Sequence, residues 1–339
     1  IRRPEARLAE RQGAPCAAAL KILSPSQKEL SMKVLVTPRS FGKTDPTLFD
    51  RLRAAGIEYS RNDTGGILDA AAMKARLADC EGLIVGVDPV SAEVLEAAPK
   101  LRAVAKYGVG LDNIDLAACE ARGIRVSRTL GAPTEAVADY TLALMLAVAR
   151  KVPLIDARCR HKDWSKITGT DLFGATLGII GLGSIGKAVV RRARGFSMKV
   201  LAHDLCWDDA YAAENGIERA DVERICREAD FISLHTVLDD STRHMINAER
   251  LAMMKPTAIL INTARGGLID GAALLTALKE GRIYGAGLDV FEEEPPAEEG
   301  WYTLDNLVMG SHCSSSTPGS SNTMGRMAVD NLLKDLGLA

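Results

Sequence analysis

From residue 32 onward, short apolar runs rich in β-branched residues alternate with amphipathic stretches of helical length. This alternation constrains the fold more than any other feature, because parallel strands need long crossover connections, which are usually helices. The expected strands form two sets. The first comprises residues 33–38, 57–62, 82–87, 103–107 and 124–129, and the second comprises residues 176–181, 199–204, 231–236, 258–263, 285–290 and 307–312. The sequence therefore predicts an α/β protein with two doubly wound parallel sheets, the second of them six-stranded and of the Rossmann type.

Helices are expected between these strands, among them residues 46–55, 70–77 and 114–122. Asp112 is the expected cap of the last of these helices. Residues 134–152 predict one long helix that is apolar on nearly every face, so it should run between domains or pack against a second subunit. Residues 317–339 are amphipathic, and we expect them to return to the first sheet, which makes the first domain discontinuous in sequence.

Composition and charge exclude several classes of protein. The formal net charge is −2, and the sequence has no basic stripe of the kind that binds nucleic acid. No apolar run reaches the roughly 18–20 residues of a membrane-spanning helix, because Arg150 and Lys151 interrupt the most apolar one. The 7 cysteines include no Cys-x-x-Cys pair and no zinc-ligand spacing, so we expect free thiols in a reducing cytoplasm and no metal site.

Residues 1–31 differ in character from the rest of the chain. They begin with Ile1, carry scattered arginines and show neither a strand nor a helix period. Glu5 and Glu10 argue against a transit peptide, and the apolar core of a secretory signal is missing. We expect this segment to be an added tail or an upstream-extended reading frame, with Met32 as the natural start.

A glycine-rich turn, GLGSIG over residues 181–186, follows one expected strand and precedes an expected helix, residues 187–194. In this setting Gly181 permits a tight turn, Gly183 lets the backbone approach a pyrophosphate, and Gly186 permits close packing of helix on strand. The N-terminus of the helix then directs its N–H groups at the phosphates. The pattern predicts a dinucleotide site, although glycine turns also occur for structural reasons alone.

Asp204 ends the strand that follows the glycine turn, about twenty residues on, where an acid binds the ribose hydroxyls of a dinucleotide. A carboxylate there repels the extra phosphate of NADP, and no arginine follows within residues 205–211. The sequence therefore predicts NAD as the cofactor, preferred over NADP by about 100-fold or more.

Ligands of open α/β sheets bind beyond the carboxyl ends of the strands. The polar residues at those positions in the second set are Asp204, Thr236, Arg265, Asp289, Glu294 and His312. Oxidation of a hydroxyl by hydride loss needs a base for the proton, which suits histidine, and a cation for a substrate carboxylate, which suits the planar fork of arginine. We assign these parts to His312 and Arg265, with Glu294 orienting His312 and favouring its protonated form, and interpret His235 as structural.

At these residues the chain resembles the D-isomer-specific 2-hydroxyacid dehydrogenases, in particular members similar to phosphoglycerate dehydrogenase. The resemblance covers essentially residues 32–339. It is carried by residues 106–115 (KYGVGLDNID), 181–186, 262–267 (NTARGG), 287–296 (GLDVFEEEPP) and 311–317 (SHCSSST). It implies a flavodoxin-like substrate domain, residues 32–130 with 313–339, and a Rossmann NAD-binding domain, residues 131–312. Family members are typically homodimers.

The resemblance also implies a role for each matching residue. Arg265 would hold the carboxylate and carbonyl of the substrate, and Glu294 would pair with His312, the acid and base. NAD would contact the glycine turn and the strand ends, through Gly181, Gly183, Ser184, Ile185, Gly186, Asp204, Thr236, Thr263 and Asp289. The substrate would contact Lys106 and, through backbone N–H groups, the loop formed by Tyr107, Gly108, Val109 and Gly110.

The substrate itself is less constrained. The resemblance makes 3-phosphoglycerate and 3-phosphohydroxypyruvate the first expectation, with the phosphate reached by Lys106, Lys166 or Arg39. The phosphate-binding arginine typical of those enzymes is replaced by Val87-Asp88-Pro89, and Ser314 and Ser315 replace the small pair after the histidine. Glyoxylate or hydroxypyruvate reduction is the alternative. An NAD-sensing protein similar to the corepressors of this family is an alternative of another class, disfavoured because long disordered flanks are missing.

Overall fold

The computed structural model describes residues 32–339, so the expectations for residues 1–31 lie outside the described part of the chain. Two parallel sheets organise this part. None of its helices is long and apolar enough to cross a lipid bilayer.

The first sheet has five parallel strands in the order β2-β1-β3-β4-β5. Their bounds are β1 Met32–Val36, β2 Ile57–Arg61, β3 Gly82–Val85, β4 Ala103–Lys106 and β5 Arg125–Arg128. The inner strands β3 and β4 are buried along their whole length, as expected of parallel strands covered by helices on both faces. All five strands confirm the first expected set.

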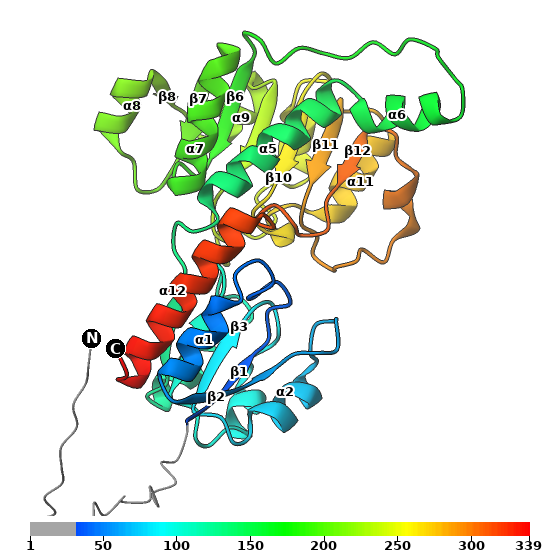
Figure 1. Cartoon of the computed structure of the whole chain (residues 1–339). Helices are drawn as coiled ribbons and strands as arrows, with labels where there is room; N and C mark the ends of the chain where they lie inside the picture. The colour runs from blue at the N-terminus through cyan, green and yellow to red at the C-terminus, as the bar shows by residue number, and fades with distance from the viewer. Residues whose placement is uncertain (1–31) are drawn as a thin grey trace, which may run out of the picture. The chain divides into compact units, whose positions relative to one another are not determined.

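Helices cover both faces of the first sheet (Figure 1). Their bounds are α1 Thr47–Ala54, α2 Ala70–Leu77, α3 Ala92–Glu96, α4 Leu116–Ala121 and α12 Pro318–Leu336. The expected cap of α4 is wrong, because the side chain of Asp115 accepts the hydrogen bond from the N–H of Ala118. Asp112 lies in the preceding loop, where its carboxylate accepts a hydrogen bond from Arg265.

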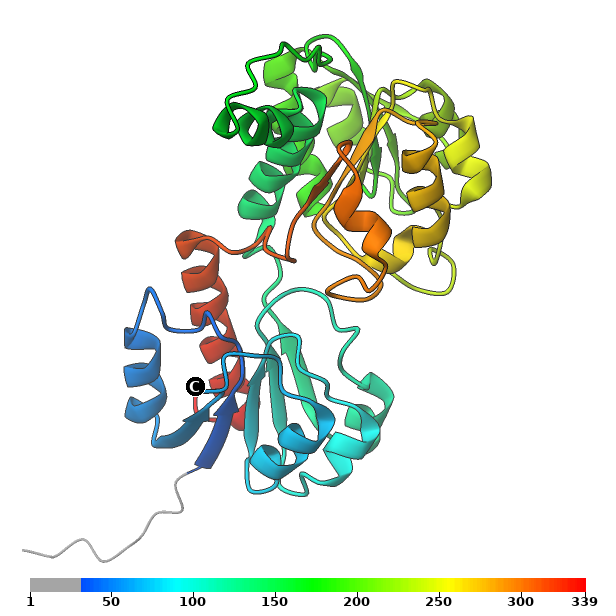
Figure 2. The ribbon, with the colours of Figure 1, turned by 90° about the vertical axis from the view of Figure 1, so that its right-hand side faces the viewer.

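The C-terminal helix α12 packs on the first sheet, against β3, β4 and β5 (Figure 2). Its buried side chains Met324, Val329 and Leu332 join the core formed by Val34 and Val36 of β1. The amphipathic tail therefore buries its apolar face on the sheet built by the first part of the chain, as expected.

The second sheet has seven parallel strands within the described residues, in the order β12-β11-β10-β9-β6-β7-β8. Their bounds are β6 Thr176–Ile180, β7 Lys199–His203, β8 Ile217–Arg219, β9 Phe231–Leu234, β10 Ile259–Asn262, β11 Gly285–Leu288 and β12 Leu307–Met309. The expected count of six is wrong, because β8 was missed. This edge strand has three residues, of which only Ile217 is buried, too few to show a strand period.

The helices of the second sheet are α5 Thr134–Ala149, α6 Val152–Arg160, α7 Ser184–Ala193, α8 Asp209–Asn215, α9 Val222–Glu228, α10 Ala248–Met253 and α11 Gly271–Lys279, with 3-10 turns at Arg194–Phe196, Gly266–Leu268 and Glu299–Thr303. The single expected helix over residues 134–152 is wrong. Lys151 has a left-handed backbone with φ 53°, which separates α5 from α6. The buried residues of α5 pack on α7, β10 and β11 of the same chain, which accounts for its apolar composition.

Candidate active site

The glycine-rich turn joins β6 to α7. Gly181 has φ +101°, and a Cβ there would lie 2.5 Å from the carbonyl carbon of His235. A Cβ on Gly186 would lie 2.2 Å from the carbonyl oxygen of Gly181. Both positions therefore require glycine, for the turn and for close packing of α7. Gly183 differs, because a Cβ there would meet no atom within 4 Å.

Gly183 is the N-cap of α7 and supplies no side-chain cap, so the first N–H groups of this helix are left to an outside acceptor. Ser184 and Ile185 are the first two residues of the helix, and Ser184 is exposed. The absence of a side chain at Gly183, the open space beside it and the uncapped helix end fit a pyrophosphate group.

Asp204 directly follows β7, and two backbone groups fix its carboxylate. Oδ2 accepts a hydrogen bond from the N–H of Leu182 at 2.6 Å, and Oδ1 accepts one from the N–H of Cys206 at 2.7 Å. The acid is thereby tied to the glycine turn. Arg219 on β8, which sequence reasoning missed, has its guanidinium 5.3 Å from the ring centre of Trp207.

Three further residues expected to line the cofactor lie beyond strands of the same sheet. Thr236 follows β9 and is half-buried. Thr263 follows β10, and its hydroxyl lies 3.0 Å from that of Thr141 on α5. Asp289 follows β11, is fully buried, and accepts hydrogen bonds from the N–H groups of Cys313 at 2.9 Å and Ser314 at 2.8 Å. Its carboxylate therefore fixes the loop that carries His312.

His312 lies three residues beyond β12 and has a left-handed backbone with φ 55°. Such a conformation is uncommon for a residue with a side chain and persists where its surroundings hold it. Here the N–H of His312 donates to the carbonyl oxygen of Asp289 at 2.8 Å. Asp289 therefore holds three successive residues of this loop.

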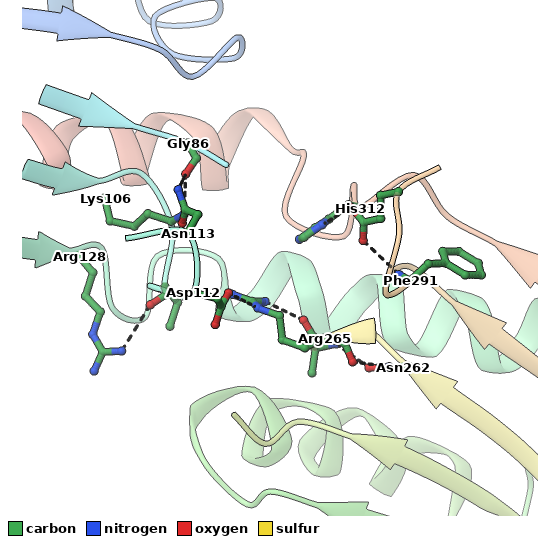
Figure 3. Close-up of polar contacts among 12 residues, drawn as sticks. Gly86, Lys106, Asp112, Asn113, Arg128, Asn262, Arg265, Phe291 and His312 are labelled. Carbon is green, nitrogen blue, oxygen red and sulfur yellow. Dashed lines mark hydrogen bonds and ion pairs between the residues drawn. The ribbon is translucent and has the colours of Figure 1, made fainter. Parts of the chain in front are cut away.

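The imidazole of His312 is paired with Glu294. Nδ1 lies 2.9 Å from Oε2 of Glu294, while Oε1 accepts a hydrogen bond from the N–H of Phe291 at 3.1 Å (Figure 3). Burial acts to raise the pKa of Glu294, but the hydrogen bond with His312 and the charge of Arg265 outweigh it, and the pKa lies below its ordinary value. Glu294 is therefore a carboxylate at neutral pH, and Nε2 of His312 is left for chemistry.

Arg265 follows β10 in a turn that Asn262 holds. The amide of Asn262 donates to the carbonyl oxygen of Arg265 at 2.8 Å and accepts from the N–H of Ala264 at 3.0 Å. The guanidinium donates from Nε to Oδ2 of Asp112 at 2.6 Å and from Nη1 to the carbonyl oxygen of Ala264 at 2.7 Å. Gly110 lies directly under it, because a Cβ on Gly110 would lie 1.4 Å from Nη2.

The loop after β4 has fewer open N–H groups than expected. The N–H of Tyr107 donates to Val85, and the N–H of Gly108 donates to the hydroxyl of Thr129. Within residues 32–339, the N–H groups of Val109 and Gly110 have no such partner. The hydroxyl of Tyr107 donates to the carbonyl oxygen of Ser321 on α12. Of these four loop residues, Val109 and Gly110 are therefore the two whose backbone N–H groups remain open to a substrate.

Lys106 is buried beneath this loop. Its Nζ donates to the carbonyl oxygen of Gly86 at 2.5 Å and to Oδ1 of Asn113 at 2.6 Å. Burial, together with the charge of Arg265, lowers the pKa of Lys106 to about 8. Asp88 is also buried and accepts hydrogen bonds from the hydroxyl of Thr37 and the N–H of Leu68.

His235 has a structural environment. Its Nε2 lies 2.8 Å from the hydroxyl of Ser233, and burial lowers its pKa to about 3. A ring that stays neutral at physiological pH cannot supply the proton for carbonyl reduction. This agrees with the structural interpretation of His235.

Sequence reasoning missed Asp112 and Asn113 as parts of the site. Both stand in the stretch KYGVGLDNID, just past the end of β4, which is the position where functional side chains of parallel sheets gather. That position was the signal that could have identified them.

A dinucleotide turn and a histidine–carboxylate pair lie at the carboxyl ends of strands of one parallel sheet. Such a protein belongs to the nicotinamide-dependent oxidoreductases of the Rossmann type. Comparison with known proteins narrows the class. Residues 142–314 match the family described as D-isomer specific 2-hydroxyacid dehydrogenase, NAD binding domain.

Relatives match over most of the chain. A glyoxylate reductase of Korarchaeum cryptofilum is 46% identical over 266 residues, which is 76% of this chain and 80% of that protein. A D-3-phosphoglycerate dehydrogenase of Methanocaldococcus jannaschii is 42% identical over 265 residues, 77% of this chain but 51% of that protein. The crystal structure of the TT0316 protein from Thermus thermophilus has a TM-score of 0.82 at 42% identity, covering 90% of this chain and 97% of that one.

Glyoxylate reductases of Thermococcus and Pyrococcus species match at 41% to 46% identity. The chain belongs to the D-isomer-specific 2-hydroxyacid dehydrogenase family. It is an NAD(H)-dependent oxidoreductase that acts on small 2-hydroxy or 2-oxo acids. The family predicted from the sequence is confirmed, but the first expected substrate, 3-phosphoglycerate, is not favoured by these relatives.

Proposed function

We propose that this protein is an NADH-dependent reductase of small, unphosphorylated 2-oxo acids, with glyoxylate or hydroxypyruvate as substrate. The observation that carries the proposal is the His312–Glu294 pair, with a carboxylate on Nδ1 and Nε2 left for the substrate. The nicotinamide, when bound, supplies the hydride.

His312 is the proposed acid. A carbonyl oxygen that gains negative charge during reduction needs a proton donor within hydrogen-bond reach, and Nε2–H of a protonated imidazole is such a donor. The negative charge of Glu294 stabilises the protonated ring, and its hydrogen bond fixes the plane of the ring. In the reverse direction the neutral ring takes the proton from the hydroxyl.

Arg265 is the proposed anchor for the substrate carboxylate. A guanidinium binds a carboxylate with two parallel hydrogen bonds, which fixes orientation as well as position. The N–H groups of Val109 and Gly110 are the proposed backbone contacts to the same substrate. Lys106 supports this loop from below.

NAD(H) would lie along the turn and the strand ends that fit it. We propose that Gly181, Gly183, Ser184, Ile185 and Gly186 surround the pyrophosphate, and that Asp204 binds the ribose hydroxyls. Thr236, Thr263 and Asp289 are proposed for the rest of the cofactor. The fixed carboxylate of Asp204 supports a preference for NAD over NADP.

Of the three cations expected to reach a phosphate, Lys106 is committed to other partners, which supports an unphosphorylated substrate. A phosphate needs a cationic side chain free to reach it. Lys106 is buried and bonded to Gly86 and Asn113, while Arg39 donates to the carbonyl oxygen of Gly65. Lys166 lies exposed in an irregular segment of the chain, and Asp88 stands in the stretch where the resemblance to phosphoglycerate dehydrogenases would place an arginine.

We further propose the domain bounds expected from the sequence: residues 32–130 with 313–339 as the substrate domain, and residues 131–312 as the NAD-binding domain. The packing of α12 on the first sheet supports this division. We also propose, from the family resemblance, that the protein forms a homodimer.

The test is NADH oxidation by the purified protein with glyoxylate, hydroxypyruvate, pyruvate and 3-phosphohydroxypyruvate. We expect kcat/KM for glyoxylate or hydroxypyruvate to exceed that for the phosphorylated acid by about tenfold or more, a difference of about 1.4 kcal/mol. A preference for 3-phosphohydroxypyruvate would overturn the proposal, as would the absence of turnover with all four acids.

A further inference from the structure

Two of the three nitrogens of the Arg265 guanidinium donate hydrogen bonds to the protein. Nε donates to Asp112 and Nη1 donates to the carbonyl oxygen of Ala264, while Nη2 has no hydrogen-bond partner among residues 32–339 (Figure 3). Arginine has five N–H donors in a fixed plane. The donors that remain belong to Nη1 and Nη2, the two nitrogens that together can bind a bidentate carboxylate.

Asp112 is itself held in place by its neighbour in the chain. The amide of Asn113 donates to the carbonyl oxygen of Asp88 at 2.6 Å and to that of Gly86 at 3.2 Å, and accepts from the buried Lys106. These bonds tie the loop after β4 to the loop after β3. The carboxylate of Asp112 therefore projects from a backbone that is anchored in the first sheet.

Resting on the proposed function, we propose that Asp112 is a positioning residue that aims the outer edge of Arg265 at the carboxylate of the 2-oxo acid. It uses a single oxygen on Nε and does not occupy the outer edge. Gly110 completes the arrangement, because any side chain there would displace Nη2. The contact of Asp112 with Nε thus sets the orientation of the Arg265 guanidinium before the substrate binds.

A role in stability alone does not account for this pair. The side chain of Asp112 is 51% exposed and that of Arg265 is 29% exposed. Ion pairs exposed to this degree contribute little to the free energy of unfolding. Loss of Asp112 should therefore leave the fold intact, which makes its effect on the site measurable.

The two effects of removing Asp112 have opposite signs. Deleting a negative charge beside Arg265 by itself favours binding of an anion. Losing the hydrogen bond that orients the guanidinium weakens that binding. A loss of affinity for the 2-oxo acid in Asp112→Ala is therefore opposite in sign to the direct effect of the lost charge, and it is the effect expected of lost positioning.

The experiment compares the wild type with Asp112→Ala and Asp112→Asn, using steady-state NADH oxidation with glyoxylate. We expect Asp112→Ala to raise KM for glyoxylate about tenfold or more. Its KM for NADH should stay within about twofold of the wild-type value. Asp112→Asn keeps an oxygen that can accept from Nε, so its KM should lie within about threefold of the wild type. The control, Asp79→Ala, removes a still more exposed carboxylate that pairs with Lys100, and it should change neither KM.

A double-mutant cycle tests whether Asp112 acts through Arg265. In an Arg265→Lys background, Asp112→Ala should cause little further loss, because residues acting through one another are not additive. An unchanged or lower KM in Asp112→Ala would overturn the inference. So would equal losses in both backgrounds, or an Asn variant as impaired as the Ala variant.

Binding of oxalate to the enzyme with NADH, followed by nicotinamide fluorescence, gives a readout that needs no turnover. The Kd of oxalate should rise in Asp112→Ala in the same proportion as KM. If the wild type turns over no 2-oxo acid, the proposed function fails, and the oxalate titration still tests Asp112. If the wild type is active and both readouts are unmoved by Asp112→Ala, the inference alone fails.

Discussion

Nδ1 of His312 lies 2.9 Å from Oε2 of Glu294, and the second oxygen of the same carboxylate accepts the N–H of Phe291. Glu294 thus has one oxygen on the ring and one on the backbone of its own loop. The pair fixes the orientation of the ring and places a negative charge on the side away from Nε2. The first prediction concerns that charge.

Glu294→Gln keeps an oxygen that can accept from Nδ1 but removes the charge. Because the protonated ring is then less stabilised, we expect kcat for glyoxylate reduction to fall by about 10- to 100-fold. The pKa of Glu294 lies below its ordinary value, so in the wild type the carboxylate is lost only at acidic pH. Glu293→Gln, in the same acidic run, is the control, and equal effects of the two variants would exclude the assigned role.

Gly110 is predicted to be essential for the position of Arg265. A Cβ there would lie 1.4 Å from Nη2, so Gly110→Ala must displace the guanidinium. We expect kcat/KM for glyoxylate to fall by about tenfold or more, while Tm changes little because the displaced atoms are the end of a flexible side chain. Gly195→Ala, whose Cβ would meet no atom within 4 Å, is the control. Unchanged kcat/KM in Gly110→Ala would show that Arg265 has no fixed position to lose.

The lowered pKa of Lys106 predicts that the free energy of unfolding depends on pH in the alkaline range. Burial lowers its pKa from 10.5 to about 8. Between these values the unfolded chain holds a proton that the folded chain has released, so the free energy of unfolding rises with pH. Each pKa unit corresponds to about 1.4 kcal/mol, so the wild type should gain roughly 3 kcal/mol relative to Lys106→Met between pH 8 and 10.5.

Denaturant unfolding of both proteins across this pH range measures the gain. Lys43→Met, at an exposed position, is the matched control and should show no such gain. A constant difference between the wild type and Lys106→Met would mean that Lys106 keeps its proton throughout the range.

Much of the fold could be predicted from the sequence, because strands buried on both faces leave continuous apolar runs such as β3 and β10. Features that depend on a single residue could not. The break between α5 and α6 rests on the left-handed backbone of Lys151, and lysine has no sequence signature for that conformation. The edge strand β8 is recognisable only through its pairing with β7.

The candidate site shows the same division. His312, Arg265 and Glu294 could be identified because each follows a strand whose end is visible in the sequence. The contact between Arg265 and Asp112 joins residues 153 positions apart, and no local pattern encodes it. The burial of Lys106 was likewise hidden, because a lysine after an apolar run is ordinarily exposed.

The position of Asp204 predicts a preference for NADH over NADPH. Its carboxylate is held by the N–H groups of Leu182 and Cys206 and cannot turn away from a ribose phosphate without losing both bonds. We expect kcat/KM with NADH to exceed that with NADPH by about 100-fold, or about 2.8 kcal/mol. Asp204→Asn keeps one acceptor oxygen without the charge and should narrow this ratio. Equal efficiency of the wild type with both cofactors would contradict the prediction.

The most direct test of the account is the turnover of His312→Ala with NADH and glyoxylate, measured beside its affinity for NADH. The account predicts that kcat falls by about 10²- to 10⁴-fold while the Kd of NADH, from nicotinamide fluorescence, stays within about twofold. Undiminished kcat in His312→Ala would contradict it, because the proton would then come from another group.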